Sequence, residues 1–256
     1  MGKLPDRIIA IFAEIGQAVY FLGEVLACVT RGRIRWTQVL RQIYEQGAQS
    51  LVIVALTALA SGMVLALQGY VALARFGAKE YVSSLVALSL TRELGPVFTA
   101  LIFSGKAGGR IAAELGTMSV NDQILGTRAM GVDPVEFLIV PRLLACCAVV
   151  PLLTVIAELV GISGGYLIGV TQAHIPAGFY ISQTIKSVTY VDFFSGLIKV
   201  VFFGLIIGWT CCYQGYRTSG GSLGVGRYTT QAVAYSYIFV ILANAGLTKL
   251  ILSVWG

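Results

Sequence analysis

From residue 46 onward the chain is a succession of long apolar runs separated by short polar segments. A helix needs about 20 apolar residues to cross the hydrocarbon core of a bilayer. Hydrophobic residues make up 57% of the chain and charged residues only 12%, about half the charged share of an average soluble domain. Five segments are long enough: Leu51–Leu73, Tyr81–Lys106, Leu143–Val170, Phe193–Tyr213 and Tyr228–Ser253. These runs predict an all-α, polytopic membrane protein with five transmembrane helices.

The segment Ile8–Val29 is long enough for a sixth span but carries Glu14, Gln17 and Glu24. At 100° per residue these polar side chains lie within about 120° of one another and leave a broad apolar face. This pattern favours an interfacial amphipathic helix over a sixth span. We therefore expect residues 1–45 to form an interfacial segment.

The remaining residues, 46–256, are expected to form the transmembrane core of a single domain that covers residues 1–256. Most basic residues precede the first span, or lie between spans 2 and 3 or between spans 4 and 5. The other connections hold only Arg75, Lys79 and Lys186. The positive-inside rule then places the N-terminus in the cytoplasm. The net charge of +6 is read as this topology signal, and no nucleic-acid partner is expected.

Charges inside the predicted membrane spans are the most informative polar feature. Arg92 and Glu93 lie in the middle of span 2, and Lys199 interrupts span 4. Such charges are expensive in lipid, so they normally face a partner or a watery cavity. Mutual neutralisation remains an alternative to a substrate path. Pro96 favours the path, because it disturbs the helix beside these charges.

The residues of common catalytic sites are largely missing. His174 is the only histidine and falls in a connection between spans, and the five cysteines lack metal-site spacing. The sequence around Gly105-Lys106 does not form a P-loop. We expect no metal, no cofactor and no enzyme activity, so any ATP must be bound by another chain.

A short polar segment joins spans 2 and 3. Ser119-Val-Asn-Asp122 has the form of a capping box, which predicts a helix over Val120–Met130. That helix is either a surface connector or a rigid lever pushed by a cytoplasmic partner.

Glycines recur at four-residue spacing in spans 3 and 4. Such ladders allow helices to approach closely, and packing within the chain is favoured over a dimer seam. The glycines are Gly161, Gly165, Gly169, Gly204 and Gly208.

Several blocks of sequence together resemble the MlaE family. They are Leu67-Gln-Gly-Tyr70, Val86-Ala-Leu-Ser-Leu-Thr-Arg-Glu-Leu-Gly-Pro96, Gly105-Lys-Ala-Gly108, Ala113-Glu-Leu-Gly-Thr-Met118 and Met130-Gly-Val-Asp-Pro134. Members of this family are permease subunits of ABC transporters that move phospholipids between the inner membrane and the outer-membrane pathway and so maintain outer-membrane lipid asymmetry. Relatives occur in plastid envelopes.

The resemblance implies several partners and a location. They are a second copy of the chain, a cytoplasmic ABC ATPase subunit, a periplasmic MCE-domain protein and, in some versions, a STAS-domain subunit. The expected location is the bacterial inner membrane, or the plastid inner envelope in a photosynthetic eukaryote.

The resemblance also implies two groups of functional residues. Leu67, Gln68, Tyr70, Arg92 and Glu93 would lie near a bound lipid, and residues 120–130 would form the coupling helix that docks on the ATPase. We add Lys199, a charge within span 4, to the lipid-binding group, and we expect Glu114, Asp122, Leu125 and Arg128 to couple the permease to its ATPase. Within the first group we expect Glu93 to pair with Lys199, which leaves Arg92 free for the lipid phosphate.

The run Asp122-Gln-Ile-Leu-Gly-Thr-Arg128 departs from the common family pattern. Gly126 weakens a helix by about 1 kcal/mol relative to alanine, and Arg128 changes the local charge. A partner ATPase from another species is therefore expected to dock less well.

Two other classes of function remain as alternatives. A secondary transporter or channel would use Arg92, Glu93 and Lys199 as a proton or ion relay and would work without an ATPase. A membrane enzyme acting on lipids is disfavoured, because the sequence has no visible set of metal ligands and no nucleophile paired with a base.

Overall fold

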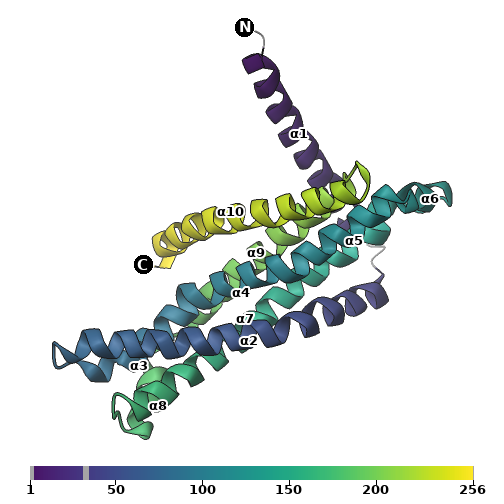
Figure 1. Ribbon diagram of the computed structural model, residues 1–256. Coiled ribbons are helices and arrows are strands. Elements are labelled where there is room, and N and C mark those ends of the chain that lie inside the picture. The colour runs from purple at the N-terminus through teal and green to yellow at the C-terminus, as the bar shows by residue number, and fades with distance from the viewer. Residues whose placement is uncertain (1–2, 31–34, 256) are drawn as a thin grey trace.

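The computed structural model describes residues 3–30 and 35–255, which form helices and no strand (Figure 1). The α-helices are α1 (Lys3–Thr30), α2 (Trp36–Ala74), α3 (Val82–Ser89), α4 (Gly95–Phe103), α5 (Gly109–Val120), α6 (Gln123–Ala129), α7 (Val140–Thr171), α8 (Ala177–Ser187), α9 (Tyr190–Tyr216) and α10 (Gly221–Trp255). A 3-10 turn, η1 (Lys79–Tyr81), precedes α3.

The five predicted spans are confirmed. In the described chain, helices long and apolar enough to cross a membrane are Trp36–Ala74, Lys79–Val120, Val135–Thr171, Tyr190–Tyr216 and Gly221–Ser253. Several extend well beyond the predicted limits. The 39 residues of α2 span about 58 Å at 1.5 Å per residue, whereas the hydrocarbon core is about 30 Å thick. The expected boundary at residue 46 therefore falls inside one continuous helix.

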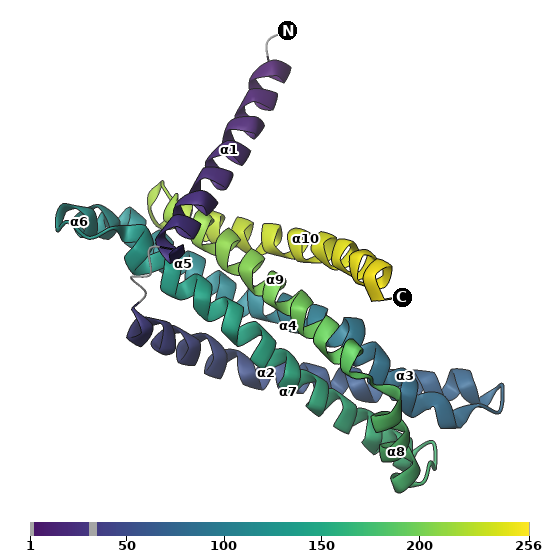
Figure 2. The same cartoon turned by 180° about the vertical axis from the view of Figure 1, so that it is seen from behind.

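Helix α1 points away from the bundle in both views (Figures 1 and 2). Its apolar part, Val19–Thr30, is shorter than a span. Phe21, Val25 and Cys28 are buried, and the Phe21 ring lies 5.5 Å from the ring of Tyr213. The side chain of Glu14 lies outside the described residues, so the interfacial placement of this segment stays a prediction.

Helix α7 lies at the centre of the bundle, with its largest contacts to α2 and α9. Glycines allow this close approach: a Cβ on Gly62 of α2 would collide with the carbonyl of Gly161. A Cβ on Gly204 of α9 would lie only 2.7 Å from the carbonyl oxygen of Cys146. The predicted use of these glycines for packing within the chain is confirmed.

Spans 2 and 3 contain π-helical turns. They are η2 (Leu90–Leu94), η3 (Ser104–Gly108) and η4 (Val135–Ile139). Such turns are rare and occur mostly at functional sites. The irregularity expected beside Pro96 takes the form of η2, which ends just before it.

The short helix between spans 2 and 3 is present as α6, but its predicted start and cap are wrong. Helix α5 continues to Val120, Asp122 takes a left-handed conformation with φ of 57°, and α6 begins at Gln123. The Ser119 hydroxyl lies within hydrogen-bond distance of the carbonyl oxygens of Tyr216 and Thr218 instead, at 3.2 and 3.0 Å. This tertiary contact competes with the local capping box.

We predict that Gly62→Ala destabilises the protein, because its new methyl group would meet the Gly161 backbone, which cannot move aside as a side chain can. Overpacking of this kind costs about 1–3 kcal/mol. Thermal unfolding in detergent measures the loss. Gly226→Ala is the matched control, since nothing lies within 4 Å of a Cβ there; equal melting temperatures for the two variants would contradict the prediction.

Candidate functional site

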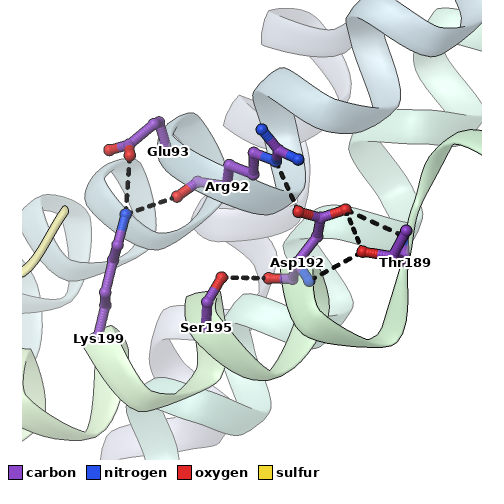
Figure 3. Close-up of polar contacts among 6 residues, drawn as sticks. All are labelled: Arg92, Glu93, Thr189, Asp192, Ser195 and Lys199. Atoms are coloured by element: carbon purple, nitrogen blue, oxygen red, sulfur yellow. Dashed lines mark hydrogen bonds and ion pairs between the residues drawn. The ribbon is translucent and has the colours of Figure 1, made fainter. Parts of the chain in front are cut away.

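A cleft of about 400 Å³ lies where η2, the start of α9 and the end of α10 meet. Its charged lining consists of Arg92 and Glu93 from η2 and Asp192 and Lys199 from α9 (Figure 3). Apolar side chains, among them Val191, Ile251 and Leu252, complete the walls. The cleft thus combines a polar cluster with apolar surface.

Glu93 and Lys199 form an ion pair, as predicted, with Nζ 2.8 Å from Oε1. Thr248 donates to the same carboxylate oxygen at 3.0 Å, and Asn244 donates to the other at 3.0 Å. The Lys199 side chain is only 3% exposed, whereas that of Glu93 is 39% exposed. A buried ammonium needs such partners, because an isolated charge in an apolar interior is very costly.

Lys199 also donates to the backbone carbonyl of Arg92 at 3.0 Å and to the Thr248 hydroxyl at 2.9 Å. Its three N–H groups therefore each have an acceptor. In a regular α-helix the Arg92 carbonyl would accept from the residue four positions on, but that residue is Pro96, which has no N–H. The proline thus leaves the Arg92 carbonyl without its usual backbone donor, and Lys199 donates to it instead.

The prediction that Arg92 is left free is wrong. Its Nε donates to Asp192 Oδ1 at 2.7 Å (Figure 3). The Arg92 side chain nevertheless remains 52% exposed, and its terminal amino groups have no partner among the described residues. The four charges of the cluster balance, and one guanidinium edge stays available.

Asp192 is the functional-site residue that the sequence analysis missed. It closes the capping box of α9: its Oδ2 accepts from the backbone N–H and hydroxyl of Thr189 at 3.0 and 2.7 Å. The pattern Thr189-x-x-Asp192 is visible in the sequence and could have flagged the residue. The capping role of Asp192 at the start of α9 gave no reason to expect that it also forms an ion pair with η2.

Three other predicted lipid-contacting residues lie apart from this cleft. Leu67 and Gln68 are exposed on α2, and Tyr70 packs beside a separate apolar cluster that includes Val82 and Tyr180. None of the three lines the cleft. Their lipid contact stays a prediction.

The four predicted coupling residues lie at the α6 end of the bundle but do not share one surface. Asp122, just before α6, and Leu125, within it, are both exposed. Arg128 donates to the Tyr216 hydroxyl at 3.2 Å. Glu114 lies on α5 and pairs with Arg142, with Oε2 3.4 Å from Nη2. A direct contact of Glu114 with a partner subunit therefore has less support from the geometry than one of Leu125.

His174 lies in an exposed connection between α7 and α8, as predicted. Within the described residues, no group of three or more histidine, cysteine, aspartate or glutamate side chains is placed to hold a metal ion. None of the five cysteines forms a disulfide within the described residues, and four of them are buried.

We predict that Glu93→Leu destabilises the protein more than Lys199→Met does. The first change leaves a buried ammonium without its anion, and removal of one partner of a buried pair costs about 3–5 kcal/mol. The second leaves a carboxylate that is partly exposed and keeps two other donors. The double variant should lose less than the sum of the single losses. Thermal unfolding of all four proteins tests this, and strictly additive losses would exclude the coupling.

Comparison with known proteins agrees with this architecture. A family model described as permease MlaE matches residues 39–250. A probable ABC transporter permease protein of Rickettsia typhi is 40% identical over 244 residues, 95% of this chain and 94% of the relative. The intermembrane phospholipid transport system permease protein MlaE of Haemophilus influenzae is 37% identical, with 94% of this chain and 93% of the relative covered.

The likeness extends to plants. The chloroplastic protein TRIGALACTOSYLDIACYLGLYCEROL 1 of Arabidopsis thaliana is 34% identical over 87% of this chain and 63% of the relative. The family match covers most of the chain, and both bacterial relatives align over nearly their whole length. The chain therefore belongs to the MlaE permease family.

Proposed function

We propose that the chain is the permease subunit of an ABC transporter that moves phospholipids between the inner membrane and the outer-membrane pathway, with ATP hydrolysed by a separate subunit. The printed name of the Haemophilus relative supports the substrate class. The observation that carries the proposal is the half-exposed Arg92 guanidinium in a cleft that also has apolar walls. A phospholipid needs both a cation for its phosphate and apolar surface for its tails.

Arg92 would bind the phosphate through its terminal amino groups. A guanidinium presents planar, paired N–H donors that match phosphate oxygens. Because Nε is held by Asp192, the side chain is already oriented. Lys199 is buried and has all its donors occupied, so its role is to fix η2 against α9 and α10 rather than to meet the lipid.

The exposed surface of α10 supports a homodimer. Only 11% of the most apolar stretch of this span is buried within the chain. In the proposed dimer, Leu67, Gln68 and Tyr70 of α2 would contribute to a lipid cavity shared between the two copies. The relay alternative has less support, because Lys199 is buried and each of its N–H groups already has an acceptor.

Helix α6 is the proposed docking element for the ATPase. Leu125 is 60% exposed there and Met130, just after the helix, is 76% exposed. The contact of Arg128 with Tyr216 would pass a push on α6 to the end of α9. Gly126 would weaken this helix relative to alanine.

The remaining assignments complete the proposed assembly. The α6 end would face the cytoplasm, with the N-terminus on the same side, in the bacterial inner membrane or a plastid inner envelope. An MCE-domain protein would receive lipid on the opposite side, and a STAS-domain subunit would bind the ATPase where one is present.

We predict that Arg92→Gln lowers the amount of phospholipid that co-purifies with the assembled transporter. Loss of one charge-assisted contact should weaken binding about tenfold or more. Phosphorus analysis and mass spectrometry of the extracted lipid measure it. Arg75→Gln, at an exposed position just after α2, is the control. Unchanged lipid content in the Arg92 variant would refute the headgroup role.

We predict that Leu125→Glu prevents co-purification of a stoichiometric ATPase from the native membrane, because a charge would replace the exposed apolar side chain of α6. Ile185→Glu on α8 is the control, since Ile185 is similarly exposed, at 71%, but lies at the other end of the bundle. A tagged chain and quantitative mass spectrometry give the readout. An ATPase retained at full stoichiometry would show that α6 is only a connector.

A further inference from the structure

A second cleft, of about 340 Å³, lies at the α6 end of the bundle, between the first turns of α2, the helix α5 and the start of α7. It is a different cavity from the one lined by the charged cluster of η2, and of the residues predicted to bind lipid or couple to the ATPase it contains only Glu114. One wall is polar and is formed by Gln38, Arg41, Gln42 and Glu45 of α2. The opposite wall is largely apolar, with Met118, Phe137 and Leu138.

The polar wall has unused hydrogen-bond donors. Arg41 uses Nε to bind Glu45 at 2.8 Å, and its side chain is 78% exposed. Its terminal amino groups have no partner among the described residues. Gln42 accepts from Gln46 through its carbonyl oxygen, which leaves its amide N–H groups without a described partner. A cation, an anion and amide donors therefore lie side by side.

The floor of the cleft is a buried arginine. The Arg142 side chain is 8% exposed, pairs with Glu114 and donates to the Leu138 carbonyl at 2.8 Å. Its Nε is buried and has no acceptor in the described structure. Glu114 is shared with a second cation, Arg110, at 3.4 Å.

The charges that line this cleft balance, with Arg41 and Arg142 against Glu45 and Glu114. The anions Glu45 and Glu114 are each already paired with arginine. The cations in the lining or in contact with it are Arg35, which stacks on Phe137, and Arg41, Arg110 and Arg142. A group that carries both signs of charge would therefore match this lining better than a simple anion.

The same turns of α2 present exposed aromatic and apolar side chains that are typical of the membrane surface. Trp36, Leu40 and Tyr44 are spaced four residues apart and are 66%, 64% and 75% exposed. At 100° per residue they form one face of the helix, beside the cleft wall. Tryptophan and tyrosine are enriched at the level of lipid headgroups, so the cleft lies at the depth where phosphates and amines are found.

We propose that this cleft binds the headgroup of a zwitterionic phospholipid from the surrounding leaflet, with the phosphate on Arg41 and Gln42 and the amine beside Glu45. In a phosphoethanolamine group the opposite charges are close neighbours, as the Arg41 guanidinium and the Glu45 carboxylate are here. The apolar wall covers the glycerol end and the first methylenes. This site lies apart from the η2 cleft, so binding here can be measured without transport or an ATPase.

Photo-crosslinking in vesicles tests the proposal. The full chain, with benzoylphenylalanine in place of Gln38, is reconstituted in vesicles of equal parts phosphatidylethanolamine and phosphatidylglycerol, and the lipid adducts are identified by mass spectrometry. We expect phosphatidylethanolamine adducts in clear excess. Arg41→Gln and Glu45→Gln should each reduce them about tenfold. Both changes are at helix surface positions, and unchanged melting temperatures verify the fold.

Two controls make the result specific. Benzoylphenylalanine at Leu40, which is exposed on the neighbouring face of α2, should label both lipids equally. The Arg41 and Glu45 changes should not alter that labelling. Arg227→Gln, an exposed cation of α10, should leave labelling at position 38 unchanged. The proposed site would be refuted if the adducts at position 38 contained the two lipids in the same ratio as the vesicle. It would also be refuted if Arg41→Gln did not change the labelling. Suppression of the lipid adduct by inorganic phosphate alone would overturn the lipid assignment in favour of a soluble anion.

Discussion

The ammonium of Lys199 connects three elements that are distant in the sequence but adjacent in the structure. It donates to the Arg92 carbonyl and Glu93 in η2, and to Thr248 in α10, while its own stem belongs to α9. Pro96 has no N–H to donate to the Arg92 carbonyl, so this carbonyl is left for Lys199. Because an unsatisfied buried ammonium is so unfavourable, this arrangement also fixes where Arg92 and Asp192 can meet.

Helix α9 connects this cluster to the opposite end of the molecule. Its first turns carry Asp192 and Lys199. Its last residue, Tyr216, contacts Arg128 in α6 and the ring of Phe21 in α1. Glycines such as Gly204 hold α9 tightly against α7. A closely packed helix moves as a rigid body more readily than it bends. Displacement at the α6 end would therefore reach the charged cleft without a chain of side-chain rearrangements.

The spans and the Glu93–Lys199 pair could be predicted from the sequence because each rests on a large local signal. A run of apolar residues has few alternatives in a membrane, and a charge within it must find its opposite. The cap predicted at Ser119 does not form, because its hydroxyl donates instead to the distant carbonyls at the end of α9, which the local sequence could not reveal. The Arg92–Asp192 pair was missed for a similar reason: Asp192 already has a sufficient local role as a cap.

The way Arg92 divides its donors limits what evolution or design can place at that position. One edge of the planar guanidinium is committed to Asp192 while the other edge is exposed. A lysine would carry the same charge as a single point on a flexible stem. It could satisfy the buried carboxylate or face the cleft, but it could not hold both positions at once. Two separable edges on one side chain, rather than positive charge as such, are therefore what this position requires.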